Sequence, residues 1–289
     1  MSVQLLQKKL INVRGIFMKK IVLVLMMCLL FLAACSSSNK ETTNSDNKRE
    51  VIKVASLISP MTDILELVKP QLEQEGYDLQ VIVLGDNVQP NVQLANKEID
   101  ANFFQHVPYM QQFNRLNDAN LVGVQPVYFA NYGVYAKNYN DFAELPNGAT
   151  VTIANDATNI DRSLALLAQH GVITLADKAE DAYWTVKDIT KNPQQLVFKE
   201  VDLLMLSRTY EEVDAVIMTP AYAKPLGLTP KSDALLTEGI ENDFAITFVA
   251  REDNQDDAAI QALAKALTSK EVKQFLEDNY DEVAIPAFD

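Results

Sequence analysis

The sequence predicts an α/β fold with largely parallel sheets. Short apolar runs rich in β-branched residues recur along the chain, and segments with apolar residues at helical spacing lie between them. Strands that alternate with helices in this way form units whose strands lie parallel in a sheet. The composition is that of a globular protein, with 48% hydrophobic and 22% charged residues in a chain of 289. We therefore expect a sizeable core, in one large or two modest domains.

Residues 51–135 are expected to form strands and helices in alternation. We expect a strand over residues 51–57, a helix from about Ile64 that Pro70 kinks or ends, a strand over 79–84, a helix over 90–97, and a helix that begins near Pro108. A long β-prone run over 121–135 follows and is rich in aromatic residues. Such a run can cross from one lobe of a protein to another.

The second half repeats the alternation. A strand over 150–154 precedes a polar turn at 155–159, and the helix that follows is closed by Gly171. Further strands are expected at 196–201, 213–218 and 244–250, with two helices at the C-terminus. Thr268 and Glu271 have the spacing of a capping box for the last helix. If the chain has two lobes, strand-like crossings near 128–135 and 243–249 join them.

The N-terminal 34 residues have the pattern of a secretory signal peptide. Met18, Lys19 and Lys20 form a basic start, and no charge occurs from Ile21 to Ala34. The apolar stretch is shorter than the roughly 20 residues that cross a bilayer. We expect translation to start at Met18, with residues 1–17 as an upstream extension.

Cys35 is the expected site of lipidation. The preceding Leu32, Ala33 and Ala34 complete a segment that resembles the bacterial lipobox, in which the cysteine becomes the first residue of the mature protein. The alternative is an ordinary signal peptide with an incidental cysteine. Residues 35–50 are polar and aperiodic, so they predict a flexible tether. The other cysteine, Cys28, lies in the leader, so the mature domain has no thiol for disulfides or catalysis.

The charge of the mature chain excludes one class of partner. Residues 1–35 contain five of the 25 basic residues and no acidic residue, so the remainder has 20 basic and 39 acidic residues, a net charge of −19. Such a surface repels phosphate backbones, so nucleic acid is not an expected partner. Attachment to a membrane must come from the lipid on Cys35.

Motifs of the common catalytic sites are absent from the sequence. It contains no G-x-S-x-G, no P-loop and no H-E-x-x-H motif, and only two histidines, His106 and His170. His170 lies at the end of a predicted helix, where a positive charge suits the helix dipole. Metal sites need several ligands at close spacing, which the sequence does not offer. We expect no enzymatic activity, no metal and no cofactor.

Two segments have the residues of a small-ligand site. Residues 98–109 bring Phe104, His106 and Tyr109 together before a helix start, and one of Phe103 and Phe104 belongs to the core because neighbours on a strand point to opposite sides. In residues 155–163, Arg162 lies in the first turn of a helix, where free N–H groups and a guanidinium favour a carboxylate. The alternative is that Arg162 pairs with Asp156 or Asp161 at the surface.

The residues from about Val51 to the C-terminus resemble the NlpA-type lipoproteins, the substrate-binding proteins of methionine ABC importers. The resemblance is carried by motifs of several residues each: Gln89-Pro90-Asn91, Ile99-Asp100-Ala101-Asn102-Phe103-Phe104-Gln105-His106-Val107-Pro108-Tyr109, Asn155-Asp156-Ala157-Thr158-Asn159, Arg162-Ser163-Leu164 and Gly227-Leu228-Thr229-Pro230. It implies a periplasmic-binding-protein-like fold: two α/β lobes, joined by two hinge strands, with a ligand cleft between them. Lobe 1 would comprise residues 51–131 and 245–289, and lobe 2 residues 132–244.

The same resemblance implies the roles of individual residues. Phe104 and Tyr109 would flank the ligand side chain and His106 would line the pocket, while Asn159 and Arg162 would hold the carboxylate. Three positions depart from the family pattern. Asn87 stands where an aromatic is usual, Met218 (followed by Thr219) where an asparagine is common, and Asp161 where a small residue is common; Asp161 could hold an amino group or partly neutralise the arginine.

These observations predict a lipid-anchored binding protein on the outer face of the cell membrane. It would capture L-methionine or a related amino acid as a monomer and deliver it to a permease driven by an ATPase. A different ligand remains possible in the same role: another apolar amino acid, a methionine derivative or a short peptide. The alternative from another class is a surface lipoprotein whose pocket has drifted and which acts in adhesion or signalling.

Overall fold

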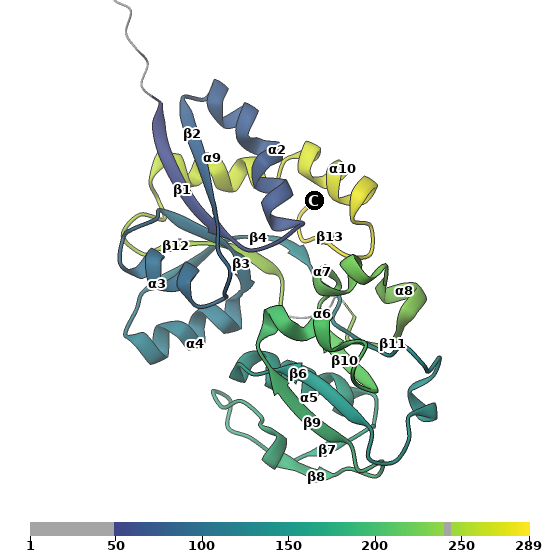
Figure 1. Cartoon of the computed structure of the whole chain (residues 1–289). Coiled ribbons are helices and arrows are strands. Elements are labelled where there is room, and N and C mark those ends of the chain that lie inside the picture. Colours follow the sequence, from purple (N-terminus) through teal and green to yellow (C-terminus); the bar gives the residue numbers. More distant parts are fainter. Residues whose placement is uncertain (1–48, 240–243) are drawn as a thin grey trace, which may run out of the picture. The chain divides into compact units, whose positions relative to one another are not determined.

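A computed structural model describes residues 49–239 and 244–289, and residues 49–289 form one compact unit. The predicted signal peptide, the lipidated Cys35 and nearly all of the predicted tether lie outside the described residues. No helix in the described part of the chain is both long and apolar enough to cross a bilayer. The secondary structure falls into two α/β lobes, each built on its own main sheet (Figure 1).

The sheet of the first lobe has the strand order β13-β4-β12-β3-β1-β2. Its strands are β1 (Glu50–Ser56), β2 (Tyr77–Val83), β3 (Ala101–His106), β4 (Leu121–Phe129), β12 (Ile246–Arg251) and β13 (Ile285–Pro286). The helices of this lobe are α2 (Met61–Gln74), α3 (Gln89–Ala95), α4 (Val107–Asn117), α9 (Ala258–Leu267) and α10 (Lys270–Asn279). The expected helices and strands of this half are therefore present, with their ends displaced by a few residues.

Helices pack on both faces of this sheet, because alternate residues of its strands belong to two different core clusters. Val54 and Phe103 belong to a core cluster with residues of α2, α9 and α10, whereas Ala55 and Val249 belong to a second cluster with residues of α3 and α4. Successive residues of a strand point to opposite faces, so in a central strand of a sheet covered on both faces all of them are buried. This explains why β3 is buried along its whole length.

The sheet of the second lobe has the order β11-β5-β10-β6-β9. Its strands are β5 (Gly133–Tyr135), β6 (Thr150–Ala154), β9 (Val197–Val201), β10 (Ala215–Met218) and β11 (Ala234–Thr237). A separate pair joins β7 (Thr174–Leu175) to β8 (Ile189–Lys191). The α-helices are α5 (Ala157–Gln169), α6 (Leu206–Thr209), α7 (Pro220–Ala223) and α8 (Pro230–Asp233), and the 3₁₀ helices are η1 (Phe142–Glu144), η2 (Val186–Asp188), η3 (Leu203–Met205) and η4 (Lys224–Leu226).

The chain crosses between the two sheets where β4 ends and β5 begins, through Ala130–Tyr132. It returns between β11 and β12, a connection that includes the undescribed residues 240–243. The fold class predicted from the sequence is confirmed.

Two details of the prediction are wrong. The sheets are mixed rather than largely parallel, because β4, β5, β11, β12 and β13 run antiparallel to their neighbours. Four of these strands flank the crossings: β4 and β11 each end at a crossing, and β5 and β12 each begin after one. The cap of α10 is Ser269, which accepts from Val272 N–H. The Thr268 hydroxyl instead donates to carbonyls of the preceding helix.

Candidate functional site

A cavity is lined by residues of both lobes. Its volume is about 530 Å³, which includes space open to solvent. The first lobe contributes Phe104, His106 and Tyr109, and the second contributes Asn159 and Arg162. The structure thus brings together the two segments that the sequence singled out. A space of this size suits a small organic ligand.

A β-bulge aims Phe104 at this cavity. Phe103 lies opposite Phe248 on β12 and Gln105 lies opposite Thr247, so Phe104 is the extra residue between them. Bulges commonly turn a side chain towards a site. Phe103 packs edge-on against Tyr128 in the core, with 6.2 Å between ring centroids. Phe104 is also buried, and its ring forms part of the cavity wall.

Hydrogen bonds among buried side-chain amides connect β3 to α3. Asn91 and Gln105 exchange two hydrogen bonds, with the Nδ2 of Asn91 2.8 Å from the Oε1 of Gln105 and the Nε2 of Gln105 2.6 Å from the Oδ1 of Asn91. Asn102 donates to the same Asn91 oxygen at 2.9 Å and accepts from Gln105 at 2.8 Å. Each amide is almost inaccessible to solvent. This cluster fixes α3 to the strand that carries Phe104 and His106, and the sequence arguments did not identify it.

His106 is a neutral hydrogen-bonding group in this site. It caps α4, where its Nδ1 accepts from the Tyr109 N–H at 3.2 Å. Because Nδ1 is an acceptor, the ring proton is on Nε2, which lies 3.4 Å from Oδ1 of Asn159 and can donate to it. Burial, followed by the positive charge of Arg162, lowers the pKa of His106 to about 3. The residue therefore adds no charge to the cavity at neutral pH.

Tyr109 and Asn87 form another part of the wall. The Tyr109 hydroxyl donates to the Asn87 carbonyl at 2.9 Å, and its ring packs edge-on against Phe104 with 5.9 Å between centroids. Burial raises the pKa of Tyr109, so the hydroxyl stays protonated. Asn87 is buried and lines the cavity at the position where the family resemblance implied an aromatic.

The start of α5 is organised by Asp156. Its carboxylate accepts from the backbone N–H of Asn159 at 3.0 Å and from the Asn159 side chain at 2.8 Å. It also accepts from the Thr158 hydroxyl. Such a cap satisfies free N–H groups of the first turn. It fixes Asn159, whose oxygen faces His106 from the other lobe.

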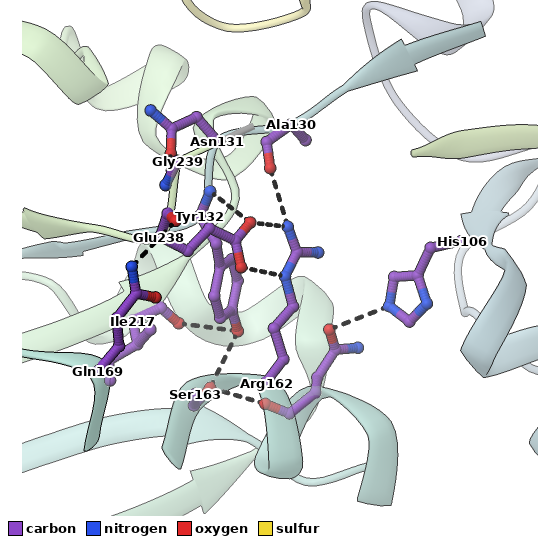
Figure 2. A network of polar contacts seen from close by, with 11 residues as sticks. His106, Ala130, Asn131, Tyr132, Arg162, Ser163, Gln169, Ile217, Glu238 and Gly239 are labelled. Carbon is purple, nitrogen blue, oxygen red and sulfur yellow. Dashed lines mark hydrogen bonds and ion pairs between the residues drawn. The ribbon is translucent and has the colours of Figure 1, made fainter. Parts of the chain in front are cut away.

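Arg162 is buried, with 1% of its side chain exposed, and is paired with Glu238 (Figure 2). Its Nε lies 2.9 Å from Oε2 of Glu238, and its Nη2 contacts both Oε1 of Glu238 and the Ala130 carbonyl. The rings of Tyr132 and Phe244 lie 4.5 and 4.4 Å from the guanidinium carbon. Its Nη1 is buried, and among the described residues it has no hydrogen-bond partner. That nitrogen can therefore donate to a ligand.

The alternative interpretation, in which Arg162 pairs with Asp156 or Asp161 at the surface, is wrong, because Arg162 is buried and pairs with Glu238. Asp156 caps its own helix, and Asp161 pairs with Lys178 and accepts from the Trp184 N–H at 2.7 Å. Asp161 lies outside the cavity lining, so it is not placed to hold an amino group there. The guanidinium edge suited to two parallel hydrogen bonds is taken by Glu238. A ligand carboxylate would meet Nη1 alone.

Of the two further residues predicted to bind the ligand, Met218 and Thr219, only Thr219 lines the cavity. Thr219 lines the cavity at the start of α7. Met218 is fully buried and does not line it. On β10, Val216 and Met218 belong to the cluster with α6 and α7, whereas Ile217 faces the cluster with α5. His170 hydrogen-bonds the Thr237 carbonyl at 2.8 Å and is exposed, which agrees with its interpretation as a helix-end residue.

Several lining residues were not predicted. An apolar wall is formed by Ile58, Met61, Tyr128, Tyr222 and Ile246. These residues come from distant parts of the chain, and the sequence carries no local signal that they meet. Within the described residues, no cluster of three or more His, Cys, Asp or Glu side chains could hold a metal ion. The arrangement combines the cationic Nη1 of Arg162, the side-chain amides of Asn87, Gln105 and Asn159, and an aromatic and aliphatic wall. Such a site suits a small carboxylate with an apolar side chain.

Comparison with known proteins agrees with this arrangement. The model of the family described as NlpA lipoprotein matches residues 52–288. A methionine-binding lipoprotein, MetQ, of Bacillus subtilis (strain 168) is 40% identical over 243 residues, which are 83% of this chain and 88% of that protein. A crystallised nutrient-binding protein from Burkholderia cenocepacia, bound to methionine, is 32% identical with a TM-score of 0.79; the match covers 82% of this chain and all of that one.

A third relative links the fold to transport. The solved structure of an ABC transporter periplasmic substrate-binding protein from Coxiella burnetii is 32% identical, with a TM-score of 0.77. The match covers 82% of this chain and 100% of that chain. The extent of these matches and the shared fold place nearly the whole described part of the chain within one family. This chain belongs to the NlpA lipoprotein family.

Proposed function

We propose that this chain is the lipid-anchored solute-binding protein of an ABC importer and that it captures L-methionine or a related amino acid. The observation that carries the proposal is Nη1 of Arg162, a buried cationic donor without a partner among the described residues, at a cavity with apolar walls. A buried cationic donor favours an anionic acceptor. An α-carboxylate supplies that acceptor, and the apolar wall accommodates the side chain.

Several interactions available at such a site favour capture of an amino acid. A hydrogen bond to a charged group contributes about 1.5–3 kcal/mol. Burial of a methionine-sized side chain contributes about 1.5–3 kcal/mol more, and contacts between a thioether and aromatic rings such as Phe104 and Tyr109 add roughly 0.3–1.5 kcal/mol. Further hydrogen bonds from Asn159 or Thr219 would contribute about 0.5–1.5 kcal/mol each, and the surplus over the cost of immobilising the ligand sets the affinity.

The remaining parts of the proposal follow from the family and the leader. The B. subtilis relative is a methionine-binding lipoprotein, the B. cenocepacia structure contains methionine, and the C. burnetii relative is a transporter component. We infer that Cys35 carries the lipid and holds the chain at the extracytoplasmic face of the membrane. The bound amino acid then passes to a permease powered by an ATPase. Phe104, His106, Tyr109, Asn87, Asn159, Arg162 and Thr219 bind the ligand, and the chain acts as a monomer without enzymatic activity.

A thermal-shift screen of the free amino acids and dipeptides tests the proposal. A ligand at 100 times its Kd adds about 2.7 kcal/mol to the free energy of unfolding, so the midpoint is expected to rise by several degrees with methionine or a close analogue. His170→Ala serves as a control, because His170 lies outside the cavity lining, unlike His106. This variant is expected to show the same rise in midpoint as the wild type. If no amino acid or dipeptide raises the midpoint, the importer assignment is contradicted.

A further inference from the structure

Glu238, the partner of Arg162, is another residue of the site that no sequence argument identified, and three hydrogen bonds hold its carboxylate. Its carboxylate accepts from Nε and Nη2 of Arg162 and from the backbone N–H of Tyr132, the last at 3.1 Å. Only 8% of its side chain is exposed. Figure 2 shows the carboxylate between the guanidinium and the chain segment at Tyr132, where the first sheet gives way to the second.

The one charge of the described cavity wall is balanced by a direct partner. Arg162 is the one charged side chain that the described part of the chain contributes to the cavity wall, and Glu238 pairs with it directly. His106 is neutral, because its pKa is lowered by burial and by Arg162. The tyrosines of the wall are neutral too, since burial raises the pKa values of Tyr109, Tyr128 and Tyr222. The described cavity wall, taken together with Glu238, is thus formally uncharged before a ligand enters.

Three carboxylates beyond this wall also act on it. Asp86, Asp156 and Asp202 do not line the cavity, but their negative charges contribute to the raised pKa values of its tyrosines.

An uncharged buried site discriminates between ligands by their net charge. A zwitterionic amino acid has a net charge of zero, so the complex contains no uncompensated charge. The same molecule without its amino group is an anion and leaves one negative charge buried, which is costly in a medium of low dielectric constant. A site with Arg162 but without Glu238 would hold a lone cation and would favour the anion.

We propose that Glu238 is a specificity-determining residue, whose negative charge makes the cavity select a zwitterionic amino acid over the corresponding carboxylate without an amino group. This inference rests on the proposed function. It differs from a purely structural role, in which Glu238 only holds Arg162 in place, because holding Arg162 would affect all carboxylate ligands equally.

Isothermal titration separates the two roles. The probes are L-methionine and 4-(methylthio)butanoate, which has the same side chain and carboxylate but no amino group. The measured quantity is the ratio of the Kd of the butanoate to the Kd of methionine. We expect Glu238→Gln, which keeps the shape and can still accept from Tyr132, to lower this ratio by about tenfold or more, because the anion gains most when the negative charge is lost.

Two variants control the experiment. Glu238→Asp retains the charge and is expected to retain the ratio. Asp161→Asn removes a negative charge from the same helix as Arg162, but its side chain faces Lys178 and Trp184 outside the cavity lining, so its ratio is also expected to match the wild type. Far-ultraviolet circular dichroism establishes that each variant is folded.

Each outcome bears on the inference. An unchanged ratio in folded Glu238→Gln, with both ligands weakened equally, overturns the role of its charge while the proposed function stands. If Glu238→Gln does not fold, the wild-type ratio decides, because a value near one contradicts selection for the zwitterion. If the wild type binds no amino acid at all, the proposed function fails, and this inference fails with it.

Discussion

The Nε2 of His106 lies 3.4 Å from the Oδ1 of Asn159, and this contact joins the two lobes across the cavity. One residue ends β3 and caps α4, and the other lies in the first turn of α5. Each is fixed by a second hydrogen bond on its own lobe: His106 to the Tyr109 N–H, and Asn159 to Asp156. The histidine must be neutral for its Nδ1 to accept, which makes the contact sensitive to pH.

This neutrality predicts how stability depends on pH. The pKa of His106 is lowered to about 3 in the folded protein, whereas an unfolded histidine has a pKa near 6.5. Between these values the unfolded state binds one more proton, so the free energy of unfolding falls as the pH falls, by about 1.4 kcal/mol per pH unit from this residue. Above about pH 6.5 the contribution is constant.

Urea unfolding at pH 7, 5.5 and 4.5 measures this slope. His106→Gln cannot take up a proton. Below about pH 6.5 its free energy of unfolding is therefore expected to fall less steeply with falling pH than that of the wild type, by about 1.4 kcal/mol per pH unit. Carboxylates add to the slope of both proteins. His170→Gln removes the exposed histidine and serves as the matched control. Equal slopes for wild type and His106→Gln would contradict a buried neutral histidine.

The Arg162–Glu238 pair predicts strongly non-additive stability changes. Arg162→Met leaves the Glu238 carboxylate buried without its partner. Glu238→Met leaves the Arg162 guanidinium buried without its partner. Each change is expected to lower the free energy of unfolding by about 3–5 kcal/mol. The double variant replaces both charges by apolar side chains and is expected to cost much less than the sum. Urea unfolding of all four proteins at neutral pH measures the coupling. Additive losses would show that the two side chains do not depend on each other.

The amide cluster predicts a smaller effect at a distance from the ligand. Asn102→Ala removes two donated hydrogen bonds, to the Pro90 carbonyl and to Asn91, and one accepted from Gln105, so that groups of these buried residues lose a partner. We expect a loss of about 1–3 kcal/mol for a group left unsatisfied. Gln71→Ala is the control, because its amide bonds Glu75 on the exposed side of α2 and is expected to cost less than about 0.5 kcal/mol. A similar, small loss for both variants would argue against the cluster as a support of β3.

The predicted anchor has a simple test. Cys35→Ala removes the only sulfur to which a lipid could be attached after the leader. We expect the variant to appear in the soluble fraction of fractionated cells, whereas the wild type sediments with membranes. Cys28→Ala, a change within the leader, is the matched control and is expected to leave the wild type's distribution unchanged. Retention of Cys35→Ala in the membrane fraction would exclude a lipid on Cys35 as the anchor.

Much of the site could be predicted because its residues lie in two short segments. Residues 98–109 and 155–163 each contain a helix start, and the polar and aromatic side chains of such starts are recognisable locally. The structure places Phe104, His106, Tyr109, Asn159 and Arg162 of these segments around one cavity.

The parts that could not be predicted depend on tertiary structure. Glu238 is 76 positions from Arg162, and in the sequence it is one acidic residue among 39. Met218 lies on a strand whose residues are all buried, so the pattern of apolar residues does not reveal which face each one joins. Crossings near 128–135 and 243–249 were predicted, but the local alternation of helices and strands does not reveal that the strands beside them run antiparallel to their neighbours.

The most direct test of the central claim is mass spectrometry of the protein purified and sprayed under native conditions. The account predicts a complex whose excess mass is that of methionine or a related amino acid, released on denaturation. It also predicts that Arg162→Ala, if folded, carries no such mass, whereas His170→Ala retains it. A retained ligand without a carboxylate, or an Arg162→Ala variant that retains the ligand as the wild type does, would contradict the role assigned to the free Nη1 of Arg162.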